Sequence, residues 1–96
     1  YLRPGDLAGR YGGEEIIVAM QASAEESVVI AERIREAVRA CRMQSAETET
    51  RELSVTMSIG IASTARTGFE ITALIGEADR ALYRAKKEGR DRVLAA

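Results

Sequence analysis

The sequence predicts an α/β sandwich in which helices pack against one β-sheet, and three observations support this. Short β-branched runs bounded by turn residues indicate strands. Two longer segments place apolar residues at helical spacing, which indicates amphipathic helices. The order of these segments along the 96 residues is β-β-α-β-α-β, with no internal repeat and no low-complexity tract. We therefore expect one domain built on a single sheet.

The first two predicted strands cover residues 7–11 and 15–20 and form a hairpin around Gly12 and Gly13. The second strand is strongly β-branched, which suits a pleated surface. A glycine pair admits positive φ, so the backbone can turn tightly there or approach a ligand with no Cβ in the way.

The first predicted helix begins after Ser23, because Ser23 and Glu26 have the spacing of a capping box. The helix should continue to about Arg42. Its apolar positions recur at helical spacing and are Ile30, Ile34, Val38 and Cys41. Residues 44–50 are polar and follow no pattern, so we expect a loop there.

The third predicted strand covers residues 53–62, where apolar residues alternate with small ones that suit close contact with a helix. A long second helix runs from Ile71, and Gly89 should end it as the residue after the C-cap. Val93 and Leu94 then form a last short strand.

Composition narrows the possible functions. Apolar residues make up 46% of the chain, charged residues 30% and aromatic residues 4%, which is typical of a small soluble globular domain. The net charge of -1 argues against binding a large nucleic acid, so a bound nucleotide should be small. No apolar run is long enough for a membrane span or a secretory signal, so we expect no direct membrane contact from this segment.

The chemistry is limited to carboxylates and basic side chains because histidine is absent. Cys41 is the single cysteine, which excludes an internal disulfide and fits a cytoplasmic location. The chain opens on Tyr1 without an initiator Met, so we expect it to be a piece of a longer protein.

Two acids, Glu14 and Glu15, follow the glycine pair at the start of the second strand. The strand gives such carboxylates a fixed position beside the turn. Hard cations such as Mg²⁺ bind oxygen ligands, so the sequence predicts that these carboxylates can bind one. The alternative is that the two acids only keep the end of the strand soluble.

The chain resembles, over its full length, the GGDEF domain of bacterial diguanylate cyclases, which condense two GTP molecules into cyclic di-GMP and release pyrophosphate. The motifs that carry the resemblance are, in order, RPGD, GGEE, AERIR, SVTMSIGIAS and ADRALYRAKKEGRDRV. Their order and spacing together make the match specific. The match covers the C-terminal part of the family's domain, so residues 1–96 would be a partial GGDEF domain with the palm fold of nucleotide cyclases.

For the active site, the resemblance implies that Glu14 is a metal ligand and the base for the ribose 3′-hydroxyl, with Glu15 in a supporting role. The glycine pair would contact the substrate. Lys86 and Arg90 would bind the triphosphate of GTP, and because they lie at i and i+4 around the end of the second helix, both can reach one anion. Favourable placement of cations at a helix C-terminus is the alternative.

For regulation, the resemblance implies that Arg3 and Asp6 form a product-inhibition site for cyclic di-GMP. An arginine can donate to guanine O6 and N7 while a carboxylate accepts from N1 and N2, although an ordinary surface ion pair is the alternative. Arg33 matches a secondary basic contact to the same ligand, and a solvated helix charge is a serious alternative. Ile16 stands where the family usually has Phe, which we expect to change packing and not ligation.

The function implied by the resemblance is a Mg²⁺-dependent diguanylate cyclase that acts as a homodimer, since each subunit holds one GTP. In the family, a metal-binding Asp and the guanine-binding Asn and Asp precede the part that this chain matches. We therefore expect the 96-residue chain to be inactive by itself but able to bind cyclic di-GMP. The alternative function is a non-catalytic cyclic di-GMP receptor.

Overall fold

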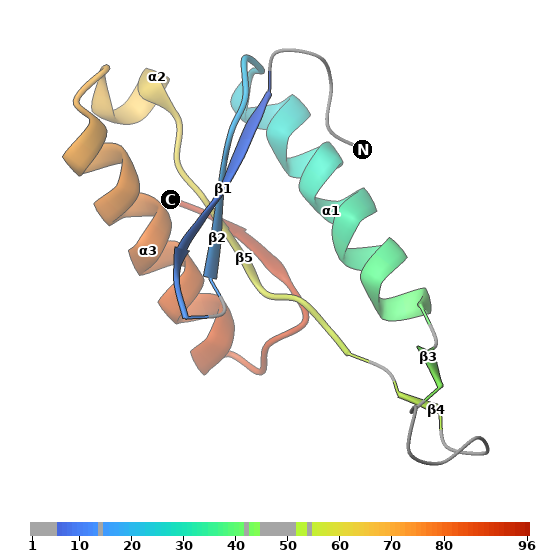
Figure 1. Ribbon diagram of the computed structural model, residues 1–96. Helices are drawn as coiled ribbons and strands as arrows, with labels where there is room; N and C mark the ends of the chain where they lie inside the picture. The colour runs from blue at the N-terminus through green and yellow to red at the C-terminus, as the bar shows by residue number, and fades with distance from the viewer. Residues whose placement is uncertain (1–5, 14, 42, 45–51, 54) are drawn as a thin grey trace.

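The structure, a computed structural model, describes residues 6–13, 15–41, 43–44, 52–53 and 55–96 (Figure 1). The helices and strands mix as the predicted α/β class requires. The strands are β1 (Leu7–Gly12), β2 (Glu15–Ala19), β3 (Met43–Gln44), β4 (Glu52–Leu53), β5 (Ile59–Ile61) and β6 (Val93–Ala95), and the helices are α1 (Ala24–Ala40), α2 (Thr64–Thr67) and α3 (Ile71–Lys87).

The described strands pair as three two-stranded sheets and not as the one continuous sheet expected from the sequence. β1 pairs antiparallel with β2, β3 antiparallel with β4, and β5 parallel with β6. Four strands were predicted and six are described: β3 was not predicted, Gln44 belongs to it and not to the expected loop, and the third predicted strand is represented by the separate β4 and β5. A continuous sheet also needs hydrogen bonds between the three pairs, which the described residues do not make.

The predicted hairpin of β1 and β2 is confirmed, with Leu7 opposite Ala19 and an irregularity in register between Arg10 and Gly12. The two strands contact each other more than either contacts another element. Leu7 is 71% exposed and Ile16 is 65% exposed, so these two apolar side chains lie outside the core of the described residues.

Helix α1 begins at the predicted capping box. The Ser23 hydroxyl accepts from the Glu26 backbone N–H at 3.1 Å, and the Glu26 carboxylate accepts from the Ser23 N–H at 3.3 Å. These two bonds satisfy N–H groups that the first turn of a helix leaves free. The helix ends at Ala40 with Cys41 as its C-cap, close to the predicted end.

The third predicted strand, residues 53–62, is wrong over most of its length. Only Ile59–Ile61 forms β5, residues 55–58 form no regular element, and Leu53 belongs to β4. The length of β5 follows from its partner, because β6 offers three residues, from Val93 opposite Ile59 to Ala95 opposite Ile61. The alternation of apolar residues in the sequence therefore extends beyond the three residues of β5 that pair with β6.

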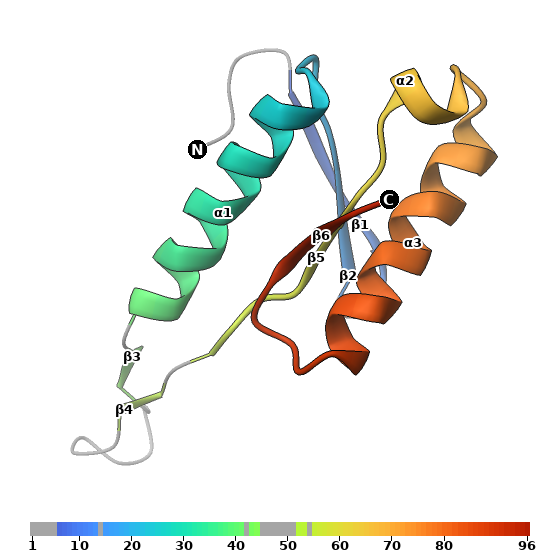
Figure 2. The ribbon, with the colours of Figure 1, turned by 180° about the vertical axis from the view of Figure 1, so that it is seen from behind.

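Both long helices contact β5 and β6, and Figures 1 and 2 show these strands between α1 and α3. The buried side chains are small: Ala31 of α1 is 7% exposed, and Ala81 and Ala85 of α3 are fully buried. A Cβ at Gly60 of β5 would clash with the backbone of Ala78 and Leu82. The absence of a side chain at residue 60 thus lets α3 lie directly on β5.

Helix α3 ends as predicted, with Glu88 as the C-cap and Gly89 beyond it at φ 123°. Its first turn is capped by the Glu70 carboxylate, which accepts from the Ala73 N–H at 2.9 Å. The short α2 was not predicted, because four residues are too few for a helical period to show. No helix in the described ranges is long and apolar enough to cross a bilayer.

We predict that Gly60→Ala destabilises the fold by about 2 kcal/mol, because the added methyl must push α3 away from β5. Gly76→Ala is the matched control within α3, where a Cβ meets only the end of the Arg80 side chain at 3.9 Å. This control should stabilise the helix by roughly 0.5–1 kcal/mol. Urea unfolding of both variants measures the difference, and equal stabilities would show that α3 does not depend on close contact at Gly60.

Candidate functional site

The structure describes the residues on both sides of Glu14 in the hairpin of β1 and β2. Glu14 and Arg3 lie outside the described residues, so their predicted roles remain predictions. Glu15 is half-buried at the start of β2 and pairs with Gly12 across the hairpin. Asp6, directly before β1, is also half-buried.

The glycine turn has the conformation that the sequence predicts. Gly13 has φ 53°, a left-handed conformation that favours glycine. A Cβ at Gly12 or Gly13 would meet no atom within 4 Å, so the turn is open to the surroundings on this side. The Arg10 side chain fixes the turn by donating from Nε to the Gly13 carbonyl at 2.9 Å.

A shallow hollow of about 370 Å³ opens beside this turn. Arg10 and Glu15 are its charged residues, and Ala8, Gly9, Gly13 and Ile16 complete its lining. One cation and one carboxylate therefore border the same open space. This is an arrangement that can hold a phosphate and a cation together.

Oxygen donors in this region fit a hard cation of the Mg²⁺ type. In the described ranges, no group of three or more His, Cys, Asp and Glu residues is arranged to hold a metal ion. Glu15 supplies the described carboxylate of the hairpin, and Glu14 precedes it in the chain. The chemistry of the donors thus agrees with the expected metal, while a full set of protein ligands is absent from the described residues.

The second predicted part of the site is the turn between α3 and β6. Lys86 is half-buried in the last turn of α3, and Arg90 is exposed beyond the helix end. Arg90 has φ 64°, an unusual conformation for a residue other than glycine. Its backbone N–H donates to the Ala85 carbonyl at 2.9 Å, which keeps the turn tight against the helix.

The described residues do not bring the two parts into one pocket. The hollow at the glycine turn is lined by β1, Gly13 and β2, and neither Lys86 nor Arg90 contributes to it. Arg33 lies exposed on α1, as expected for either a ligand contact or a solvated charge. The predicted site residues thus occupy three separate places: the hairpin, the α3–β6 turn and the face of α1.

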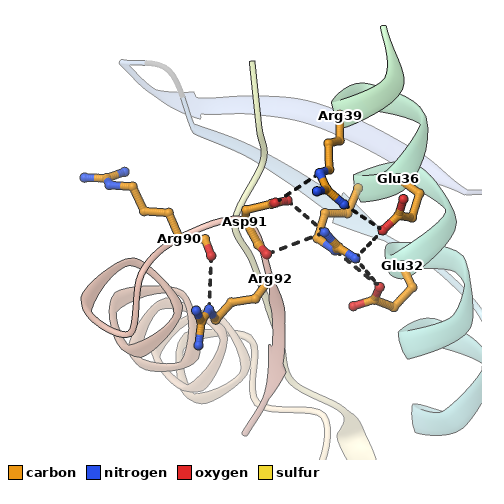
Figure 3. A network of polar contacts seen from close by, with 7 residues as sticks. Glu32, Glu36, Arg39, Arg90, Asp91 and Arg92 are labelled. Carbon is orange, nitrogen blue, oxygen red and sulfur yellow. Dashed lines mark hydrogen bonds and ion pairs between the residues drawn. The ribbon is translucent and has the colours of Figure 1, made fainter. Parts of the chain in front are cut away.

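Sequence reasoning missed a network of charges that joins α1 to the α3–β6 turn. Arg35 donates from Nη1 to Asp91 Oδ1 at 2.8 Å, across 56 residues of sequence (Figure 3). The Arg35 guanidinium also lies 2.9 Å from Glu32 Oε2 and 2.6 Å from Glu36 Oε1. Hydrogen bonds that Arg35 donates to Glu32 and Asp91 hold the pKa of Arg35 above its ordinary value. The motif AERIR contains Arg35, but nothing in the sequence pairs it with Asp91.

Comparison with known proteins identifies a common family. The family model for "Diguanylate cyclase, GGDEF domain" matches residues 1–92. Diguanylate cyclase A of Treponema denticola is 39% identical over 92 residues, which are 95% of this chain and 24% of that protein. The chain therefore spans about a quarter of the length of this relative.

Two solved structures have the same fold. The GGDEF domain of DgcB from Caulobacter crescentus, in complex with c-di-GMP, matches with a TM-score of 0.81 and 31% identity over 97% of this chain and 54% of that one. Diguanylate cyclase SiaD from Pseudomonas aeruginosa, in complex with its activator SiaC, matches with a TM-score of 0.84 and 36% identity over 99% of this chain and 35% of that one.

We predict that Gly13→Ala loosens the hairpin by about 1 kcal/mol, because a Cβ disfavours the left-handed conformation at φ 53°. Amide hydrogen exchange of β1 and β2 measures the effect and should become faster. Gly9→Ala is the control, since Gly9 lies in β1 with open space around it and without a positive φ. Unchanged exchange in Gly13→Ala would contradict the assigned turn.

Proposed function

The chain belongs to the GGDEF domain family of diguanylate cyclases, and on that basis we propose that the protein containing it condenses two GTP molecules into cyclic di-GMP and two pyrophosphates. Residues 1–96 form one part of this domain. The share of the solved DgcB domain that the chain covers, 54%, supports this division. The proposed place of action is the cytoplasm, where GTP is available.

The observation that carries the proposal is the glycine turn. Gly13 adopts the left-handed conformation, and Arg10 holds its carbonyl at 2.9 Å. The next residue in the chain is Glu14, and Glu15 opens β2. A fixed, open turn followed by acids is the arrangement that a nucleotide with a bound cation needs.

The proposed reaction proceeds by two equivalent attacks. The ribose 3′-oxygen of one GTP bonds to the α-phosphorus of the other, the bond from that phosphorus to the pyrophosphate oxygen breaks, and the 3′-hydroxyl proton passes to Glu14. Lys86 and Arg90 bind the triphosphate and stabilise the charge on the departing pyrophosphate.

Glu14, with Glu15 in support, would hold a Mg²⁺ ion, which would neutralise charge on the phosphates. A homodimer supplies the second substrate, because each subunit presents one GTP and the ring closes between the two. The cation, the contacts to the triphosphate and the partner subunit would together position the 3′-oxygen of one GTP for attack on the α-phosphorus of the other.

Product binding is the second part of the proposal. Arg3 and Asp6 bind one guanine of cyclic di-GMP, the arginine to O6 and N7 and the carboxylate to N1 and N2. Arg33, exposed on α1, adds a basic contact from a neighbouring surface. The solved DgcB domain, which was crystallised in complex with c-di-GMP, supports a ligand of this class.

A non-catalytic cyclic di-GMP receptor is the second candidate function. It is favoured for this chain by the incomplete set of metal donors among the described residues. A cation held by one or two carboxylates keeps most of its water and is poorly placed to promote attack on phosphorus. Both candidate functions therefore include binding of cyclic di-GMP, and only the cyclase forms it from GTP.

We predict that the 96-residue chain forms no cyclic di-GMP from GTP and Mg²⁺ but binds cyclic di-GMP. The reason is that Glu14 and Glu15 by themselves would leave the cation mostly hydrated. Chromatography of the reaction mixture tests the first half and calorimetry the second. Product in the mixture would disprove the first half, and an absence of binding would remove the receptor function.

We predict that Arg3→Ala and Asp6→Ala each weaken cyclic di-GMP binding by at least about 1 kcal/mol, roughly fivefold in Kd. Each variant removes one charge-assisted contact to guanine. The control is Arg80→Ala, which removes an exposed arginine paired with Glu77 at 3.1 Å on α3. Calorimetry should show an unchanged Kd for the control, and an unchanged Kd for Arg3→Ala and Asp6→Ala would refute this binding site.

A further inference from the structure

The turn after α3 holds three successive residues at positive φ, two of which are not glycine. Gly89 has φ 123°, Arg90 has φ 64° and Asp91 has φ 46°. A positive φ is easy for glycine but costs energy for residues with a Cβ. Such conformations persist only where surrounding contacts enforce them, and they are concentrated at ligand clamps and active sites.

Contacts within the turn hold one side of it. Arg92 donates from Nε to the Arg90 carbonyl at 3.0 Å, and its Nη1 lies 3.5 Å from Glu88 Oε1. A Cβ at Gly89 would lie 2.9 Å from Arg92 Nη2. The turn therefore wraps closely around the Arg92 guanidinium.

Helix α1 holds the other side through Asp91. Arg35 Nη1 lies 2.8 Å from Asp91 Oδ1, and Arg39 Nε lies 3.6 Å from Asp91 Oδ2. The Arg35 side chain is only 13% exposed, and Glu32 and Glu36 fix its guanidinium from within the helix. This is a well-oriented and largely enclosed ion pair, unlike a mobile surface pair.

The two left-handed residues send their side chains in different directions. Figure 3 shows Asp91 directed to Arg39 of α1, whereas the Arg90 side chain extends away from Asp91 and Arg92. The strained backbone thus separates a structural carboxylate from an exposed cation one residue before it.

Resting on the proposed function, we propose that Arg35 and Asp91 are positioning residues for the triphosphate of GTP. Their ion pair fixes residue 90 in its left-handed conformation, so that Arg90 and Lys86 face one anion.

Calorimetry of the chain with inorganic triphosphate, GTP and GMP tests this role. We expect Arg35→Gln to weaken triphosphate and GTP binding about tenfold, equivalent to one lost charge-assisted hydrogen bond. GMP lacks the outer phosphates, so its affinity should stay unchanged. Loss of affinity that was equal for all ligands would indicate a merely structural role and would overturn the proposal.

Two substitutions at Asp91 separate the ion pair from the backbone conformation. Asp91→Gly and Asp91→Asn both tolerate positive φ, so both variants should fold. Asp91→Gly removes the contact to Arg35 and should weaken triphosphate binding as much as Arg35→Gln. Asp91→Asn keeps an acceptor for Arg35 and should have a smaller effect. Triphosphate affinity that was unchanged in Asp91→Gly would overturn the proposal.

The matched control is Arg80→Gln, which breaks an ion pair of similar length, 3.1 Å to Glu77, away from the turn. It should leave the affinities for all three ligands unchanged. If the unmodified chain bound GTP and the Arg35 and Asp91 variants bound it equally well, the positioning role alone would be refuted. If the unmodified chain bound neither triphosphate nor GTP, the proposed function of this turn would be refuted as well.

Discussion

Helix α3 lies directly on β5, and this contact determines where the chain must turn after the helix. Gly60 has no side chain, so the helix backbone at Ala78 and Leu82 lies against the strand. Ala81 and Ala85 of the same helix are fully buried. Because β6 pairs with β5 immediately after α3 ends, the connection must reverse direction within a few residues. The left-handed turn is the result of that demand, and it carries the cation proposed to bind the triphosphate.

Charge then links this turn to the opposite side of β5 and β6. Arg35 on α1 pairs with Asp91 and is itself held by Glu32 and Glu36. An ion pair with good geometry and several partners orients its members more strongly than it stabilises a fold. This is why we assign the pair a role in positioning Arg90. By contrast, the hairpin of β1 and β2 is stabilised at its own turn, where Arg10 Nε donates to the Gly13 carbonyl.

Local signals in the sequence predicted local structure well. Gly13, the capping box at Ser23 and the helix end at Gly89 are confirmed because a few neighbouring residues decide each of them. The third strand was predicted too long, since its length depends on pairing with β6, which is distant in sequence. The pair of Arg35 and Asp91 could not be predicted, because helical periodicity places Arg35 on a face of α1 without saying what lies opposite. Family resemblance supplied roles for Glu14 and Arg3, which lie outside the described residues.

Titration of the isotopically labelled chain with GTP, followed residue by residue by amide NMR, tests whether the glycine turn and the α3–β6 turn, which share no pocket among the described residues, both respond to one nucleotide. We expect GTP to shift the amide signals around the glycine turn, residues 12–15, together with those of the α3–β6 turn, residues 86–92. Signals on the exposed face of α3 around Arg80 should remain in place. Shifts at only one of the two turns, or shifts confined to other surfaces, would contradict the account.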